Sequence, residues 1–223
     1  MAKVFLSAGH GGNDPGAVAN GLIEKDINLQ VMLACQAELV RHGVTVVCSR
    51  VIDENDPWKE EAREANASGA DLAASFHANA GRGDGFEGLH YPGDDNGIRL
   101  VQLAEKYVKE IGQNSRGAKP RGDLGFINST TMTAVIFESF FVDSNDRYIG
   151  DTVAEQQAFG VAYAKAILEY LGITYKEPVA IKTETSTLYR VQVGAYRQKA
   201  NANAMLQKVK AAGFTDAFIT MAT

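Results

Sequence analysis

Residues 3–16 have the sequence Lys3-Val-Phe-Leu-Ser-Ala-Gly-His-Gly-Gly-Asn-Asp-Pro-Gly16. The apolar run from Lys3 to Ser7 predicts a short buried strand. This strand leads directly into a glycine-rich loop, where glycine lets the backbone turn sharply and leaves the imidazole of His10 unscreened. The stretch therefore predicts the first strand of a sheet, with a histidine just beyond its end.

Further strands and helices alternate along the chain up to about residue 172. Apolar residues at helical spacing, with glycine or proline at the boundaries, predict helices at 26–42, 57–68, 98–111 and 153–171. Apolar and β-branched runs predict strands at 44–48, 71–76, 86–91 and 134–141. This alternation predicts an α/β fold in which a mostly parallel or mixed sheet is flanked by helices.

The C-terminal part of the chain has a different composition. Residues 173–187 are polar, rich in threonine and contain a proline, so we interpret them as a linker. The pattern after them predicts a strand at 188–193, a helix at 199–212 and a strand at 217–220. A β-α-β piece of this size is too small to fold alone, so we expect it to pair with a similar half or to pack against another part.

Composition and charge exclude several classes of protein. The chain is 45% hydrophobic and 22% charged, which is typical of a folded protein. The net charge is −5, and the acidic first part argues against nucleic acid as the main partner. We expect no membrane span and no secretory signal, because no apolar run is long enough for either. Cys35 and Cys48 lie in apolar stretches, so we expect reduced core residues rather than a disulfide framework.

Three candidate metal ligands lie at the ends of predicted elements. His10 follows the first strand, Glu24 precedes the first long helix, and His77 follows the strand at 71–76. Each has a simpler explanation when taken alone: a surface-loop histidine, a carboxylate that favours a helix N-terminus, and a capped core histidine. Together, two histidines and one glutamate match the three protein ligands of a catalytic zinc site, which keeps a fourth position open for water.

Glu138 is the only charged residue in the apolar stretch 133–142. A carboxylate buried there is costly unless it is paired or protonated. One interpretation is a structural acid bonded to backbone N–H groups. The other is a general base beside a metal site, because burial raises the pKa of a carboxyl toward neutrality. With the three-ligand set in place, we favour the general base.

Six stretches occur in the order and spacing of a known family. They are Gly9-His-Gly-Gly-Asn-Asp-Pro-Gly-Ala17, Gly21-Leu-Ile-Glu-Lys-Asp26, Ser49-Arg50, Arg63 with Asn66, Ala70-Asp-Leu-Ala-Ala-Ser-Phe-His-Ala-Asn79 and Phe137-Glu-Ser-Phe-Phe141. Over about residues 1–172, the chain resembles the zinc-dependent N-acetylmuramoyl-L-alanine amidases. Two departures from the family pattern are Ser7-Ala8 in place of Asp-Pro, and Ser139 where a small or apolar residue is more usual.

The resemblance implies one zinc ion held by His10, Glu24 and His77, with Glu138 as the catalytic carboxylate. It also implies a reaction, the hydrolysis of the amide that joins the lactyl group of N-acetylmuramic acid to L-alanine of the peptidoglycan stem peptide. It assigns no substrate-binding residue. Two other functions remain open: a zinc peptidase that cuts within the stem peptide, and a wall-binding protein that has lost its activity. The retained Glu138 argues against the second.

Residues 188–223 resemble a single, incomplete copy of the sporulation-related repeat, which binds peptidoglycan. The stretch that carries this resemblance is Leu188-Tyr-Arg-Val-Gln-Val-Gly-Ala-Tyr-Arg197. Its two tyrosines, Tyr189 and Tyr196, either lie against sugar rings or pack a small core. Since a complete domain has two such halves, we expect pairing with the same segment of another chain, which makes a homodimer, ahead of packing on the catalytic domain or on a second repeat.

The expected route to the cell wall follows from the apparent lack of a secretory signal. The enzyme would be synthesised in the cytoplasm and would reach peptidoglycan only after the membrane fails, through lysis or a holin. This behaviour is typical of an autolysin that lyses the mother cell of a spore former, and equally of a phage or prophage endolysin.

Overall fold

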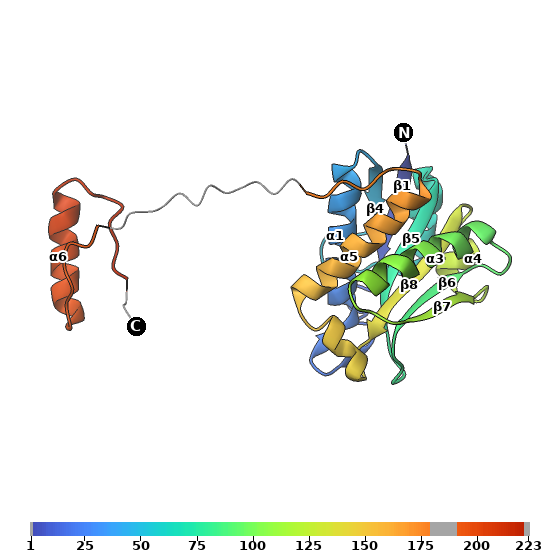
Figure 1. Ribbon diagram of the computed structural model, residues 1–223, viewed down its shortest axis with the longest axis horizontal. Helices are drawn as coiled ribbons and strands as arrows, with labels where there is room; N and C mark the ends of the chain where they lie inside the picture. The colour runs from blue at the N-terminus through green and yellow to red at the C-terminus, as the bar shows by residue number, and fades with distance from the viewer. Residues whose placement is uncertain (1, 179–190, 221–223) are drawn as a thin grey trace. The chain divides into compact units, whose positions relative to one another are not determined.

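The computed structural model describes residues 2–178 and 191–220 and divides the chain into two compact units (Figure 1). The first unit is Met1–Glu177 and the second is Pro178–Thr223. Among the helices of the described residues, none is long and apolar enough to cross a membrane.

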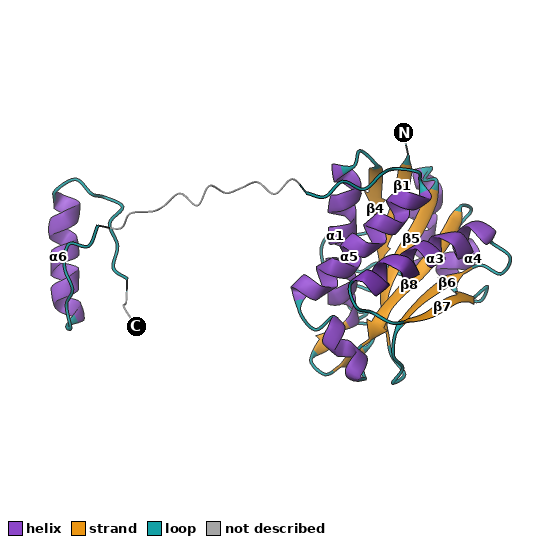
Figure 2. Cartoon of the chain, viewed as in Figure 1, coloured by secondary structure: helices purple, strands orange, loops and turns teal. Residues whose placement is uncertain are grey.

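The first unit contains a six-stranded sheet with the order β4-β1-β5-β8-β6-β7 (Figure 2). Its strands are β1 (Lys3–Ala8), β4 (Thr45–Cys48), β5 (Leu72–Asn79), β6 (Phe86–His90), β7 (Ser115–Pro120) and β8 (Thr133–Phe141). The first four strands in the order are parallel, β6 is antiparallel to β8, and β7 is parallel to β6. The predicted mostly parallel or mixed sheet is confirmed. A short hairpin of β2 (Val18–Ala19) and β3 (Leu22–Ile23) lies outside the sheet.

Helices cover both faces of this sheet. They are α1 (Glu24–Arg41), α2 (Trp58–Ser68), α3 (Asp95–Glu110), α4 (Gly125–Ser129) and α5 (Val153–Tyr170), with a 3-10 helix, η1, at Asn145–Ile149. Helices α1, α3 and α5 pack on one face and form the larger core; α2 and α4 pack on the other. Alternate residues of β8 divide between these cores, so that Val135 and Phe137 point to one and Ile136 points to the other.

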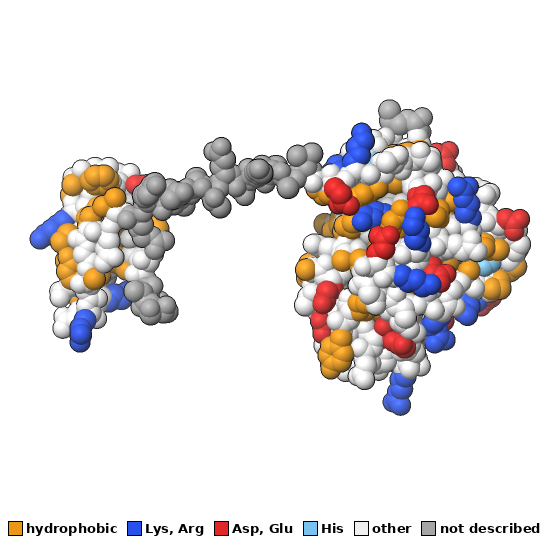
Figure 3. Space-filling model, in the orientation of Figure 1, with side chains coloured by type: hydrophobic (Ala, Val, Ile, Leu, Met, Phe, Trp, Pro, Cys, Tyr) orange, Lys and Arg blue, Asp and Glu red, His pale blue; other side chains and the backbone are white. Residues whose placement is uncertain are grey.

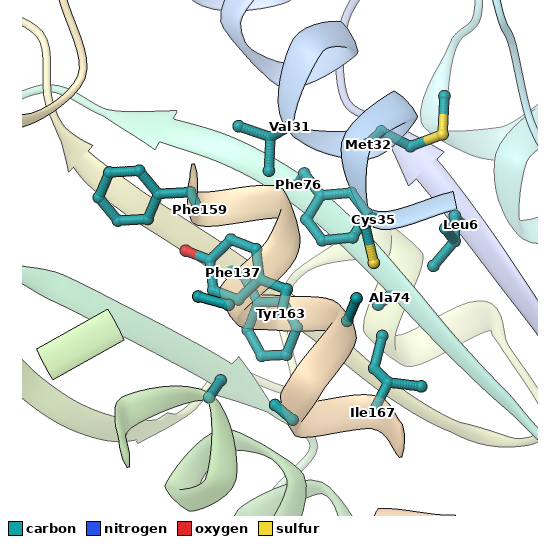
Figure 4. Packing of buried hydrophobic residues seen from close by; sticks show 14 of the residues in the cluster. Leu6, Val31, Met32, Cys35, Ala74, Phe76, Phe137, Phe159, Tyr163 and Ile167 are labelled. Atoms are coloured by element: carbon teal, nitrogen blue, oxygen red, sulfur yellow. The ribbon is translucent and has the colours of Figure 1, made fainter. Parts of the chain in front are cut away.

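The larger core is dense in aromatic rings. Phe137 and Tyr163 stack with ring centroids 4.6 Å apart, and Phe76 lies against both (Figure 4). Cys35 is buried in the same core as a free thiol, and Cys48 is free and partly buried, as predicted. Stacked rings fix the position of β8 relative to α5. The end of β8, where Glu138 lies, is therefore rigidly held.

Several features of the first unit differ from the sequence predictions. Helix α1 begins at Glu24 itself, which was predicted to precede the helix. Strand β5 extends to Asn79, so His77 lies within the strand, where it pairs with Glu138, and does not follow it. Strand β7 was not expected, because its sequence Ser-Arg-Gly-Ala-Lys-Pro has no apolar run and it is an edge strand. Helix α4 has only five residues, too few for a periodic pattern.

The predicted linker does not begin as a free segment. Ile173 and Tyr175 pack against the core of the first unit, and the Tyr175 ring stacks on His42 with centroids 4.9 Å apart. The first compact unit accordingly runs to Glu177, five residues beyond the predicted boundary at 172. Residues 179–190, most of the predicted linker and the first part of the predicted strand at 188–193, lie outside the described residues.

In the second unit, the predicted helix is present as α6 (Lys199–Ala211), but the predicted strands are wrong where they are described. Residues 191–193 and 217–220 form no strand. Helix α6 buries none of its residues, and exposed apolar side chains surround it (Figure 3). An alternating pattern gives a strand only when a neighbour completes its hydrogen bonds, and two short strands beside one helix supply too little burial to hold that pairing.

Replacement of Gly160 by valine should destabilise the first unit. A β-carbon at this position in α5 would lie 2.3 Å from the carbonyl oxygen of Val31 and 2.6 Å from the Ala34 β-carbon, so α1 and α5 must move apart. We expect Gly160→Val to lower the free energy of unfolding by about 2–3 kcal/mol in urea denaturation. Ala154→Val, on the exposed side of the same helix, is the control and should cost less than about 1 kcal/mol. Equal losses in the two variants would contradict close packing of these helices.

Candidate metal centre

The three predicted ligands come from three different elements that meet at the carboxyl ends of β1 and β5. His10 follows β1 with φ at 66°, in the left-handed region. Glu24 is the first residue of α1, and His77 lies near the end of β5. Gly9 makes this approach possible, because a β-carbon there would lie 2.2 Å from the His77 ring. Residue 9, between β1 and His10, must therefore be glycine to leave room for the His77 ring.

Glu24 is the centre of the cluster and is only 5% exposed. Its Oε1 lies 3.2 Å from His10 Nε2 and 2.9 Å from His77 Nδ1. The backbone N–H of Ala17 donates to its other oxygen at 2.7 Å. Burial disfavours the ionised form, but the hydrogen bonds from the two histidines outweigh this and hold the pKa of the Glu24 carboxyl well below its usual range. Glu24 is thus an anion at every pH of interest.

The two imidazoles are oriented by carboxylates. Asp14 accepts from His10 Nδ1 at 2.9 Å, which leaves His10 Nε2 directed at Glu24. The two histidine rings meet edge to face, with centroids 5.1 Å apart. The hydrogen bond to Glu24 raises the pKa of His10 to about 9. A metal must therefore displace a proton from His10, so metal affinity should fall as pH falls.

This donor set fits a zinc ion. One atom from each of His10, Glu24 and His77 can be chosen so that all lie within 4.8 Å of one another. Two neutral imidazole nitrogens and one carboxylate oxygen are ligands that zinc prefers, and three protein ligands leave a fourth position for water or substrate. Asp14 behind His10 is the outer carboxylate that commonly orients a metal-bound histidine.

Glu138 lies beside the cluster, opposite His77 in the parallel pairing of β5 with β8. Burial raises the pKa of Glu138 to about 7. One extra residue of β8 follows directly, because Asn79 pairs with Phe141 rather than with Phe140. Ser139 points into the larger core by the same alternation that places Val135 and Phe137 there, and its hydroxyl accepts from the Tyr163 phenol at 3.0 Å. The serine that departs from the family pattern therefore anchors the strand next to Glu138.

Arg50 holds the loop that carries His10. Arg50 is 2% exposed, and its guanidinium donates to the carbonyl oxygens of Ala8, Gly9, Lys25 and Ile52. These contacts join the end of β1, the start of α1 and the loop after β4. Arg50 appears in the sequence only as part of a motif, and nothing in its neighbours there indicates this role.

Other functional contacts were missed for different reasons. Asp14 lies four residues after His10, and Asn28 lies four residues after Glu24; this sequence spacing could have suggested both. Asn28 Nδ2 donates to the Gly9 carbonyl at 2.9 Å. Glu61 of α2 is buried and has no local signal; burial raises the pKa of its carboxyl to about 7. Glu87 lies opposite Glu138 in the antiparallel pairing of β6 with β8, which only the sheet reveals.

Residues 4–169 match the family model described as N-acetylmuramoyl-L-alanine amidase. The chain belongs to this family. It is an N-acetylmuramoyl-L-alanine amidase, a peptidoglycan hydrolase, which confirms the predicted reaction and favours it over the peptidase alternative. Residues 161–221 match the SPOR domain model, so the C-terminal domain type is also as predicted. That match begins inside α5, within the first compact unit.

Curated relatives agree with this family assignment. The amidase is 32% identical over 219 residues to the sporulation-specific N-acetylmuramoyl-L-alanine amidase of Bacillus subtilis, an alignment that covers 96% of this chain and 83% of the relative. It is 38% identical over 180 residues to the endolysin of Bacillus phage SPP1, covering 73% of this chain and 66% of the relative.

Solved structures show the same fold. The catalytic domain of CwlV from Paenibacillus polymyxa superposes with a TM-score of 0.72 at 26% identity, covering 78% of this chain and 100% of that domain. AmiC2 of Nostoc punctiforme also gives a TM-score of 0.72 at 26% identity, covering 77% of this chain and 97% of the other. The alignments therefore cover the whole of the CwlV catalytic domain and nearly all of the AmiC2 chain.

The raised pKa of Glu138 predicts a pH-dependent effect on stability. Between the unfolded value of 4.5 and the folded value of about 7, the unfolded chain ionises Glu138 while the folded chain keeps it neutral. Stability contributed by the neutral carboxyl is present below pH 4.5 and is lost as pH rises through 7. In chelator-treated protein, Glu138→Gln should thus gain about 1–2 kcal/mol over the wild type at pH 8 and much less at pH 5.

Urea denaturation at the two pH values measures this gain. Glu110→Gln, an exposed change at the end of α3, is the control and should stay within about 0.5 kcal/mol of the wild type at both. A Glu138→Gln effect that is the same at pH 5 and pH 8 would show that the carboxyl has no raised pKa.

Proposed function

We propose that His10, Glu24 and His77 hold one zinc ion and that Glu138 is the catalytic base of the amidase reaction. The observation that carries this proposal is the convergence of the three donor atoms within 4.8 Å, with Glu138 paired to His77 across the strands. A bound zinc ion would polarise the scissile carbonyl and acidify a water molecule.

The residues of the chain have distinct tasks in this proposal. Glu138 takes a proton from the attacking water and passes it to the nitrogen of the leaving L-alanine, because a carboxyl with a pKa near 7 both accepts and donates at neutral pH. Asp14 accepts a hydrogen bond from His10 Nδ1 and so keeps the proton of the neutral imidazole on that nitrogen. This leaves Nε2, which faces the cluster, free to bind the metal. Arg50 and Asn28 hold the Gly9 carbonyl and so fix the backbone next to His10.

Loss of either histidine should remove zinc and activity together. We expect His10→Ala and His77→Ala to lower zinc content, measured by atomic absorption after dialysis, and to abolish lysis of purified peptidoglycan in a zymogram. His42→Ala is the matched control, because His42 caps the opposite end of α1, roughly 27 Å from Glu24 along the helix. Full zinc occupancy in His77→Ala would contradict the assignment of His77 as a ligand.

Glu138→Gln should separate metal binding from chemistry. Glutamine keeps the shape of the side chain but cannot accept the proton, so kcat should fall by at least roughly 10²–10⁴-fold, with zinc content unchanged. The measurement is release of a free L-alanine amino terminus from a soluble muramyl peptide. Near-normal turnover would rule out Glu138 as the base, whereas a parallel loss of zinc would make it a structural residue of the metal centre.

We further propose that the SPOR match at the C-terminus serves to hold the enzyme on peptidoglycan. The charge of this part supports the proposal, since α6 presents Lys199, Lys208 and Lys210 on an exposed helix, opposite in sign to an anionic wall. In a Glu138→Gln background, in which digestion of the wall should be at least roughly 100-fold slower, removal of residues 178–223 should weaken sedimentation with insoluble peptidoglycan roughly tenfold or more. Unchanged binding would place the wall contact in the first unit.

Pairing of two C-terminal segments in a homodimer stays a prediction. The exposed apolar side chains of this unit, among them Val191, Phe214 and Phe218, are what a partner would cover. Light scattering of the full chain and of residues 1–177 decides between the options. A doubled mass for the full chain alone supports pairing, and monomers in both cases contradict it.

The biological setting that we propose is cell-wall lysis during sporulation. The alignment with the sporulation-specific relative covers 96% of this chain, against 73% for the phage endolysin, and it therefore includes much of the C-terminal part. In this setting, the enzyme is made in the cytoplasm and acts once the mother-cell membrane fails. Transcription confined to late sporulation supports the role, and transcription only on prophage induction favours the endolysin role.

A further inference from the structure

Edge strand β7 has an irregularity beside the proposed catalytic base. Phe86 of β6 pairs with Ser115, but Gly88 pairs with Ala118, so β7 has one residue more than β6 over this interval. Arg116 and Gly117 together lie opposite Glu87, and Gly117 has φ at 76°, in the left-handed region that favours glycine. Bulges of this kind next to active sites redirect a side chain. Here the redirected side chain is that of Arg116.

The guanidinium of Arg116 is held on two sides. Its Nε donates to Glu87 Oε1, while Asn79 Nδ2 donates to Glu87 Oε2 at 3.2 Å. Its Cζ lies 5.5 Å from the ring centroid of Phe141. Neither terminal nitrogen of Arg116 has a hydrogen-bond acceptor within residues 2–178 and 191–220. The side chain is 46% exposed, so an oriented pair of N–H groups is available to a ligand from solvent.

This guanidinium lies close to the reacting centre. Glu87 and Glu138 are directly opposite each other in the antiparallel pairing of β6 with β8. Opposite residues point to the same face of a sheet, with β-carbons about 5 Å apart. Arg116 therefore lies one side chain beyond Glu138, on the face that also carries His77.

We propose that Arg116 is a substrate-specificity residue that binds a carboxylate of the stem peptide. The proposal rests on the proposed function, because it takes Glu138 as the base and so places the scissile amide beside it. In this proposal the stem peptide runs from Glu138 across β6 toward β7. Neighbouring strands lie about 4.8 Å apart and a peptide spans about 3.3–3.6 Å per residue, so on this path the residue after L-alanine comes within reach of the Arg116 side chain. That residue is acidic, and the stem peptide continues through its side-chain carboxyl, so its α-carboxyl is not used in the chain and is either free or amidated. Arg116 would bind the free carboxylate with both terminal nitrogens and would gain much less from a neutral amide.

The test uses two soluble muramyl peptides that differ only in whether the α-carboxyl of the residue after L-alanine is free or amidated. For the wild-type full chain loaded with zinc, we expect kcat/KM to be roughly tenfold higher for the free acid, mainly through a lower KM. Arg116→Gln should raise KM for the free acid by about the same factor and leave KM for the amide nearly unchanged. Arg116→Lys should restore only part of the preference, because it cannot bind a carboxylate through two nitrogens.

Arg41→Gln is the control. The Arg41 side chain is also exposed, at 33%, and Glu38 accepts from its Nε at 3.1 Å, but it lies at the end of α1 opposite Glu24, roughly 25 Å away along the helix. This variant should keep the preference of the wild type for the free acid. A similar loss in Arg41→Gln would reduce the effect to general surface charge and would overturn the assignment.

Two further outcomes distinguish failure of the Arg116 proposal from failure of the proposed function on which it rests. If the wild type cleaves both peptides equally well, or if Arg116→Gln slows both to the same extent, Arg116 acts only by neutralising Glu87 and the specificity role is wrong. If neither peptide releases a free L-alanine amino terminus while both bind, the proposed catalytic assignment fails instead, and the difference in affinity between the acid and the amide still decides the role of Arg116.

Discussion

The carboxylate of Glu24 joins three parts of the chain that are distant in sequence. It is buried at the start of α1, and it meets the imidazoles of His10 and His77 as well as the backbone N–H of Ala17. A buried anion of this kind is tolerable only when several donors surround it. The helix N-terminus adds a favourable partial charge. Removal of any one donor would leave the charge under-compensated, so the loop after β1, helix α1 and strand β5 must keep one arrangement.

The loop after β1 is fixed from behind as well as from the metal side. The Gly9 carbonyl accepts from Asn28 and from the buried guanidinium of Arg50, so the backbone before His10 cannot shift without breaking bonds inside the protein. A planar guanidinium with several donors suits this task better than a point charge would. The ligands are therefore held in place before a metal arrives, and less ordering entropy is lost on binding.

The sheet separates stability from chemistry by face and by position. Helices α1, α3 and α5 bury the larger core on one face, where rings such as Phe137 and Tyr163 stack. Glu138 and Glu87 point to the opposite face, beyond the smaller core beneath α2 and α4. One bulge in β8 follows Glu138 and another in β7 aims Arg116, so both irregularities of the sheet flank the same site. The regular strands supply rigidity and set the direction of Glu138, and the bulge in β7 redirects Arg116.

The sequence by itself determined the alternating α/β architecture, the three candidate ligands and the carboxylate in β8. These features are local, since each depends on an apolar period, a glycine loop or a single charge in an apolar run. The tertiary structure alone decided which side chains meet. The pairing of His77 with Glu138, the position of Glu87 opposite Glu138 and the path of β7 all depend on strand register, which links residues far apart in sequence. The segments 191–193 and 217–220 of the C-terminal unit were predicted as strands but form none, for the same reason: an alternating pattern becomes a strand only when a neighbouring strand completes its hydrogen bonds.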